Sequence, residues 1–371
     1  MAPRTTNRGA RFGAVAGAFA LSATLAACGG SSDGAESDDS RTLSFGYHTG
    51  EKTPIGQVWA WWMDEVETRT DGSITFDPYW DGTLVKGPDI VESLTDGRVD
   101  VSQVMPTLYT TTFPVTSVHE LPFQSSNSPA VSAAMAELAS DAEGPVAGEF
   151  EAKGLRPLAW AIGGSSALGT MDPVETVADL EGVRIRGNDR SSKVMGAAGA
   201  NIINMELADV YGSLDRGLLD GVYGVPFGFV GPLKYPEVVG SFTDTGMGVA
   251  SANALSMSQE LWDSLTEEQR EVVLEVNAEV PAKIAEVEQT WNESSCDAVK
   301  ADGDTAFVLP QAESDKIADA GKEEVDQEWR DQVTDAGADP EAFYSDYRAA
   351  LDAAEADNPG IETGVAICAA G

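Results

Sequence analysis

Arg186 is the residue of this chain whose type and position best suit the binding of an organic anion. It ends a short segment in which Val183 and Ile185 alternate with arginines, as in a half-buried strand. A guanidinium group at a strand end can pair with a carboxylate through two parallel hydrogen bonds, which the ammonium group of lysine cannot do. The alternative interpretation is a surface arginine paired with Glu181 or Asp189.

The two histidines of the chain suggest two further kinds of site. His48 and Tyr47 follow a predicted strand, where they can hydrogen-bond the oxygen atoms of a ligand, and a solvated turn is the alternative. A serine hydrolase would combine a histidine with Ser165 or Ser166, but the surrounding sequence lacks the Gly-x-Ser-x-Gly elbow. Turnover of ester substrates would favour that reading. No cluster of cysteines and histidines has the spacing of metal ligands, so we expect no metal and no cofactor.

The three cysteines divide into one plus a pair. Cys28 follows Leu25-Ala-Ala and closes an apolar stretch that begins after three arginines and is too short to span a bilayer. This pattern is typical of a bacterial lipoprotein, with residues 1–27 as signal peptide and Cys28 as the lipid attachment site; an Ala-rich first helix is the alternative. Outside the reducing cytoplasm we expect Cys296 and Cys368 to form a disulfide, and two buried thiols are the alternative.

Residues 28–41 are rich in Gly, Ser and Asp and predict a flexible tether with a reach of about 20 Å. The chain has 61 acidic and 23 basic residues and a formal net charge of −38, which excludes nucleic acid as a reasonable partner. Because the acidic residues are spread along the chain, they indicate a solvated, salt-adapted surface more than an acidic docking tail. Any site for an anion must therefore depend on local cations.

The elements that position these residues alternate between helix and strand. Thr53-Pro54 predicts a helix start, with the following tryptophans as core residues, and strands are expected at 73–76 and from Val99. Pro88 is expected to open the helix between those strands. This alternation predicts α/β domains with mainly parallel sheets.

Glycines and caps mark further boundaries. Gly97 and Gly217 stand at the same place in two similar segments, and each is expected to end a helix in the left-handed conformation. Thr266 and Gln269 form a predicted capping box for a long helix that runs toward Trp291, which Pro281 should kink or break. A short strand is expected at 306–309.

A set of motifs in the middle of the chain resembles the central signature of DctP-type solute-binding proteins of TRAP transporters. The matching residues are Leu180-Glu-Gly-Val-Arg-Ile-Arg186, Gly199-Ala200, Met205, Val210-Tyr-Gly-Ser-Leu214 and Leu219-Asp-Gly221. The resemblance extends from Leu43 to about Tyr347. Outside the centre it is carried by Gly72–Tyr79, Gly97–Asp100, Glu120–Phe123 and the helical region from Trp262 to Val280.

The resemblance implies a two-lobed fold of the type II periplasmic-binding kind, with two mainly parallel sheets flanked by helices and a long helix bridging the lobes. It places lobe I at residues 42–160 with 252–290 returning to it. Lobe II is expected at residues 161–251, with 291–371 returning to it. The implied protein is not an enzyme.

The resemblance also implies a binding site between the lobes, with Arg186 holding the carboxylate. Further contacts are expected from Asn188, Met105, Trp160, Phe227, His48 and Tyr47. The chain departs from relatives that bind sugar acids: Ser165-Ser166 replaces a second arginine, Met105 a glutamate, Leu207 an aromatic residue and Gly224 an asparagine. These departures predict a less polar pocket for a small monocarboxylate or oxo-acid with an apolar portion.

The expected partners follow from the same resemblance. They are a small organic acid, the membrane permease subunits of a TRAP transporter and, through the lipid on Cys28, the cell membrane. The protein is expected to be extracytoplasmic and lipid-anchored. A lipid-anchored sensor that binds the same acid is an alternative that the sequence does not separate from transport.

Overall fold

The computed structural model describes residues 40–249, 252–358, 360 and 362–371. The predicted signal peptide and the proposed lipid attachment site at Cys28 lie outside these residues. The first strand, β1, already begins at Arg41, so the C-terminal end of the predicted tether belongs to the folded part.

In the described residues the strands form two sheets, and the first has the order β2-β1-β3-β10-β4. Its strands are β1 (Arg41–Gly46), β2 (Ile74–Tyr79), β3 (Val101–Val104), β4 (Leu155–Ile162) and β10 (Ala252–Ser258). The helices along this part of the chain are α1 (Pro54–Arg69), α2 (Ile90–Thr95), α3 (Ser128–Ser140), α4 (Pro145–Glu151) and α7 (Gln259–Ser264).

The second sheet has the order β11-β9-β5-β8-β6-β7. Its strands are β5 (Ser166–Thr170), β6 (Arg184–Arg186), β7 (Asn201–Ile203), β8 (Gly221–Pro226), β9 (Ser241–Asp244) and β11 (Thr305–Val308). The short helices between them are α5 (Arg190–Ala197) and α6 (Leu207–Asp215). Short 3-10 helices are η1 (Gly87–Asp89), η2 (Pro106–Leu108), η3 (Thr116–Glu120), η4 (Val177–Leu180), η5 (Phe227–Phe229) and η6 (Tyr235–Glu237).

Both sheets are mixed rather than mainly parallel, which corrects that detail of the expected α/β fold. β1 pairs in parallel with β2 and β3, but β10 runs antiparallel to both β3 and β4. In the second sheet β5 runs antiparallel to β8 and β9, whereas β6 is parallel to β7 and β8. The chain enters the second sheet at β5, returns to the first at β10 and reaches the second again at β11.

The first helix begins and packs as its sequence predicts. The hydroxyl group of Thr53 accepts a hydrogen bond from the Gly56 backbone N–H at 3.2 Å, which caps α1 as predicted. Trp59 and Trp62 are fully buried among apolar residues of α1, β1, β2 and the long helix α8 (Glu267–Asp302), which confirms their role in the core.

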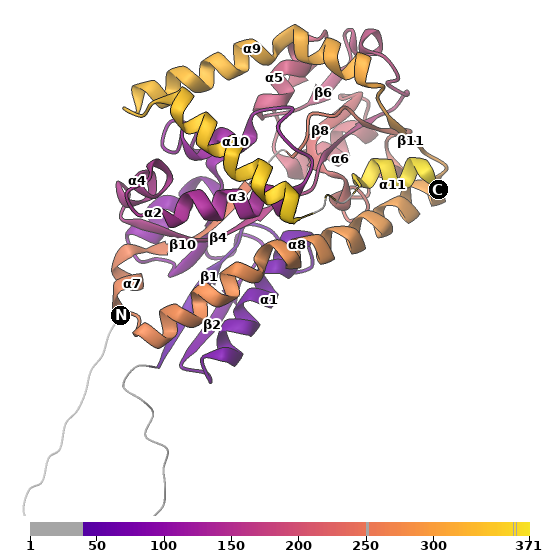
Figure 1. Ribbon diagram of the computed structural model, residues 1–371. Helices are drawn as coiled ribbons and strands as arrows, with labels where there is room; N and C mark the ends of the chain where they lie inside the picture. The colour runs from indigo at the N-terminus through magenta and orange to yellow at the C-terminus, as the bar shows by residue number, and fades with distance from the viewer. Residues whose placement is uncertain (1–39, 250–251, 359, 361) are drawn as a thin grey trace, which may run out of the picture. The chain divides into compact units, whose positions relative to one another are not determined.

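The long helix α8 (Glu267–Asp302) packs against α1, α3 and β4 near the first sheet and against η5, β11 and α11 near the second (Figure 1). The capping box of Thr266 and Gln269 is present at its start. The helix continues through Pro281, so the predicted break is wrong, whereas the predicted kink stays a prediction.

Three helices complete the chain: α9 (Gln311–Asp335), α10 (Pro340–Asp357) and α11 (Gly364–Ala370). α9 packs on α5 and η4, whereas α10 packs on α3. Strands from 41–162 and 252–258 share one sheet, and strands from 166–308 outside that return share the other. The lobe boundaries themselves stay a prediction.

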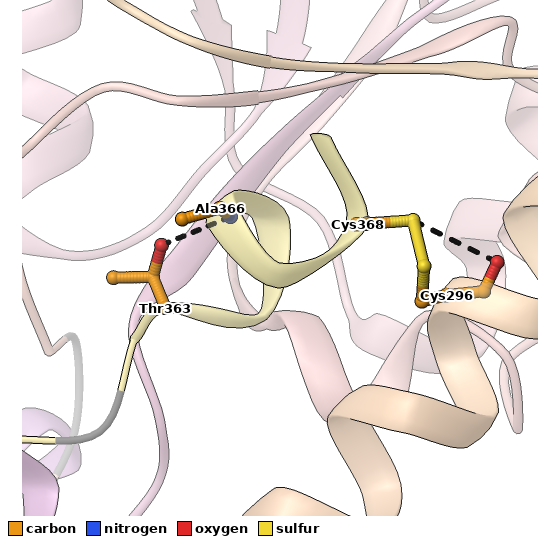
Figure 2. Close-up of a disulfide and its surroundings, with 4 residues drawn as sticks. All are labelled: Cys296, Thr363, Ala366 and Cys368. Carbon is orange, nitrogen blue, oxygen red and sulfur yellow. Dashed lines mark hydrogen bonds between the residues drawn. A yellow bond between two sulfur atoms is a disulfide. The ribbon is translucent and has the colours of Figure 1, made fainter. Parts of the chain in front are cut away.

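A disulfide between Cys296 and Cys368 joins α8 to α11 (Figure 2). The hydroxyl group of Thr363 accepts a hydrogen bond from the Ala366 backbone N–H and caps α11. The covalent bond and the cap together fix the C-terminal helix against the end of α8.

Candidate anion-binding site

Arg186 lies at the C-terminal end of β6, between the parallel strands β7 and β8. Its side chain is only 5% exposed. Its Nε donates a hydrogen bond to the backbone oxygen of Met205 at 3.1 Å, and Nη1 donates to that of Tyr223 at 3.4 Å. Burial lowers the pKa of Arg186, but an arginine remains charged at any ordinary pH.

Within the described ranges, no carboxylate forms an ion pair with Arg186 within 4.0 Å. The surface-arginine alternative therefore does not hold. Arg184, two residues earlier in the strand, is the one paired with Asp220, through Nη2 and Oδ1 at 2.5 Å. Arg186 is a buried cation whose hydrogen bonds go to two carbonyl dipoles, so it retains charge that a ligand carboxylate can neutralise.

Asp189 and Gly224 shape the space beside this guanidinium. Asp189 caps α5, because its Oδ1 accepts a hydrogen bond from the Ser192 backbone N–H at 2.7 Å. Gly224 has φ +80°, and a Cβ atom there would lie 2.7 Å from Asp189 Oδ2 and 3.9 Å from Arg186 Nη1. The glycine is required by both the backbone and the close carboxyl group. Burial raises the pKa of Asp189, and Arg186 opposes that shift.

Tyr235 is a neighbour of Arg186 that the sequence reasoning missed. Its ring is 1% exposed, and its hydroxyl group has no hydrogen-bond partner in the part of the chain that the structure describes. Burial raises its pKa to about 12, with Arg186 acting in the opposite direction. Nothing in the local pattern around Lys234-Tyr-Pro could have indicated this proximity, because it depends on how η6 returns toward the strand ends.

Tyr47 and His48 directly follow the C-terminal end of β1, an inner strand of the first sheet. Tyr47 is buried, its ring lies 4.8 Å from that of His48 and 5.8 Å from that of Trp80, and burial raises its pKa to about 12. His48 is half-buried with no partner for Nδ1, and burial lowers its pKa to about 4. It is therefore neutral near pH 7 and can offer a hydrogen bond without a charge.

The structure brings the predicted site residues together in two groups. Gly224 lies beside Arg186 at the second sheet, and the exposed Asn188 comes two residues after Arg186 in the chain. Met105 follows β3, which pairs with β1, the strand that precedes Tyr47 and His48. Among the described residues, no hydrogen bond, ion pair or ring contact joins one group to the other. Leu207 begins α6 and is 37% exposed.

Two predicted contacts have their side chains in the core. The Trp160 ring lies 6.0 Å from that of Phe150, and the Phe227 ring lies 5.9 Å from that of Phe242. Both Trp160 and Phe227 are 1% exposed. Their proposed role in ligand contact is thus not supported by an exposed face, and it stays a prediction.

The serine hydrolase alternative receives no support from the geometry. The hydroxyl groups of Ser165 and Ser166 are buried without a hydrogen-bond partner, so no base is positioned to activate them in the described structure. Over the same residues, no cluster of three or more His, Cys, Asp or Glu side chains is arranged to hold a metal ion. The helices that the structure describes are each too short or too polar to cross a membrane.

Two sheets joined by a long bridging helix are the architecture expected of a solute-binding protein. The family model of DctP, described as bacterial extracellular solute-binding protein, family 7, matches residues 45–332. The chain belongs to this family, which confirms the resemblance seen in its motifs. The family consists of substrate-binding proteins of transporters, which is not a class of enzymes.

Two relatives illustrate the similarity in sequence. A solute-binding protein of Chromohalobacter salexigens is 26% identical over 275 residues, which cover 72% of this chain and 74% of the relative. The 2,3-diketo-L-gulonate-binding periplasmic protein YiaO of Escherichia coli is 27% identical over 53% of this chain and 60% of its own length.

Solved structures show the same fold. A TRAP solute-binding protein of Rhodoferax ferrireducens in complex with copurified benzoate has a TM-score of 0.75 and 24% identity, covering 86% of this chain and 99% of that one. A TRAP periplasmic solute-binding protein of Bordetella bronchiseptica with bound mandelate has a TM-score of 0.71 and 21% identity, covering 84% and 99%. The two-lobed periplasmic-binding fold is thereby established.

Proposed function

We propose that this protein captures a small organic acid by pairing its carboxylate with Arg186 and delivers it to the permease of a TRAP transporter. The observation that carries the proposal is the buried guanidinium, which has no carboxylate partner among the residues that the structure describes. In a site removed from water, an anion can accept hydrogen bonds from the remaining N–H groups of Arg186, and these bonds are charge-assisted. The permease step follows from the family.

The chemistry around Arg186 favours an acid with one carboxylate. Gly224 places no side chain beside the guanidinium, and Asp189 occupies the adjoining space with a carboxyl group that disfavours a second ligand carboxylate. Structural neighbours carry benzoate or mandelate, although others carry galacturonate or glucuronate. We therefore propose a monocarboxylate, with Tyr47, His48, Met105 and Asn188 as further contacts.

Calorimetry of the purified chain with benzoate, mandelate and galacturonate tests this proposal. We expect one-site binding of a monocarboxylate, and Arg186→Ala should weaken it by about 2 to 5 kcal/mol, or roughly 30-fold or more in Kd. Arg184→Ala is the matched control, because it removes an arginine of the same strand that already has a carboxylate partner. Equal affinity of the Arg186→Ala protein and the wild type would exclude Arg186 from the site.

We also propose that Cys28 is acylated and holds the protein at the cell membrane. The support is the sequence before it, with three arginines and an apolar stretch. Expression with a labelled fatty acid should give a labelled, membrane-associated chain, and Cys28→Ser should be unlabelled and released. Labelling that survives this substitution would contradict the proposed attachment site.

A further inference from the structure

A small cavity lies where the chain passes between the two sheets. It is lined by the start of α1, by residues 162–164 between β4 and β5, by residues 226–229 after β8, and by residues 284–292 of α8. Its volume is about 20 Å³, which is enough for about one water molecule. Each segment that lines the cavity either packs on one of the two sheets or connects them.

This location makes the cavity sensitive to movement. Residues 162–164 leave the first sheet and enter the second, and α8 packs on α1 and β4 on one side and on η5 on the other. A rotation of one sheet against the other must change the torsion angles of such connecting residues. The walls of the cavity then separate or close.

Glu288 of α8 lines this cavity and is poorly satisfied there. Glu288 is 8% exposed, and its Oε2 atom has no hydrogen-bond partner in the described structure. A Cβ atom at Gly164 would overlap Oε1 of Glu288. The segment between β4 and β5 therefore approaches the carboxyl group so closely that only a glycine fits.

The groups that face Glu288 do not neutralise it. Its polar neighbours are Ser128, at the start of α3, and Asn292. Hydrogen bonding to them lowers the pKa of Glu288, but by less than burial raises it. The residues that α1, the 162–164 link and the 226–229 segment contribute to the cavity are uncharged, as are the other α8 residues that line it. Burial is the largest effect and raises the pKa of Glu288 to about 7.

We propose that Glu288 is a proton-sensitive element of the hinge, in which the neutral carboxyl group favours the packed arrangement of the two sheets and the carboxylate favours an opened one. On opening, water enters the cavity and the carboxyl group releases its proton to solvent. On closing, the proton returns, because an unpaired carboxylate in this apolar space is costly. The inference deepens the proposed function, since closure over an organic acid is the movement that it regulates.

Small-angle X-ray scattering of the ligand-free chain between pH 5.5 and 8.5 tests the inference. The wild type should show a radius of gyration that increases with pH, with a midpoint at or below pH 7, because the pKa of Glu288 is raised to about 7 only while the carboxyl group is buried. Glu288→Gln should keep the low-pH value throughout. Glu286→Gln is the matched control on the same helix, since its exposed side chain should leave the transition unchanged.

A radius that does not change with pH in the wild type, or the same transition in Glu288→Gln, would overturn the inference. If Glu288→Gln fails to fold, Glu288→Met removes the same proton with a different shape and takes its place. Scattering is recorded without ligand, so a chain that shows the transition but binds none of the acids in calorimetry would contradict only the proposed function.

Discussion

Arg186 and its neighbours show how a cation can be kept both buried and available. The two backbone oxygens that accept from it fix the guanidinium plane, and no side-chain carboxylate competes for its remaining donors in the described residues. Asp189 is close, but its Oδ1 is committed to the N-terminus of α5. Gly224 is the residue that lets these two charged groups approach one space.

Substitution of Gly224 tests this close packing. Gly224→Ala and Gly217→Ala place a Cβ atom on similar left-handed backbones, with φ +80° and +65°. Only the first meets Asp189; around Gly217 nothing lies within 4 Å. Both variants should lose about 1 kcal/mol from the backbone, and Gly224→Ala about 1 to 2 kcal/mol more from the displaced cap, as measured by urea unfolding. Equal losses in the two variants would show that Asp189 moves aside freely.

Strand alternation and the family motif indicated Arg186, and the structure buries this side chain with Gly224 beside it, while its role in binding stays a prediction. The distribution of the aromatic residues could not be predicted from the sequence. Phe227 falls in the 3-10 helix η5, where no periodicity decides which way a ring points, and Trp160 packs with residues far away in the chain. Tyr235 was missed for the same reason, because its position depends on tertiary structure.

At the scale of elements, α8 and α11 form the part of the fold that joins distant segments. α8 contacts both sheets, and α11 packs on its C-terminal half beside β11 and β9. A Cβ atom at Gly364 would overlap Phe227, so the start of α11 lies directly against η5. The disulfide therefore fixes an element that covers η5, a segment of the second sheet's side of the molecule that packs on α8.

Removal of the disulfide should destabilise the protein substantially. The bonded cysteines are 72 residues apart, and the chain-entropy model gives about 4 kcal/mol for a loop of this length. We expect the double substitution Cys296→Ser and Cys368→Ser to lower the free energy of unfolding by about this amount in urea. Cys28→Ser is the control and should have no effect. A loss below about 1 kcal/mol would mean that packing alone holds α11.

Helix ends were predictable because their signals are local. The caps of α1 and α8 and the left-handed glycines Gly97 and Gly217 need only the residues nearby. The mixed sheets were not predictable, since β10 pairs with β4 across almost a hundred residues. The uninterrupted course of α8 through Pro281 also depends on tertiary packing, which outweighs the local preference of proline.

For the whole molecule, charge is the dominant surface property. The formal net charge is −38, and many acidic side chains lie on exposed helix faces where few cations are near. Ion pairs such as Lys193 with Glu328 and Arg348 with Asp352 offset a small part of this repulsion. The same field opposes the approach of an anionic ligand at long range, so the proposed capture requires a local cation such as Arg186, whose attraction acts within the screening distance.

Added salt should therefore stabilise the protein. Raising NaCl from 10 to 150 mM shortens the Debye length from about 30 Å to about 8 Å, which weakens repulsion between exposed carboxylates while leaving buried contacts unchanged. We expect the Tm of the ligand-free chain at pH 7.5 to rise by several degrees over this range, and KCl should give the same curve because screening depends on ionic strength. The salt-dependent rise in Tm should be smaller at pH 5, where some exposed carboxylates bind protons and the repulsion between them falls. A Tm that is independent of salt at pH 7.5 would mean that the acidic side chains are too far apart to repel, and that the composition affects hydration alone.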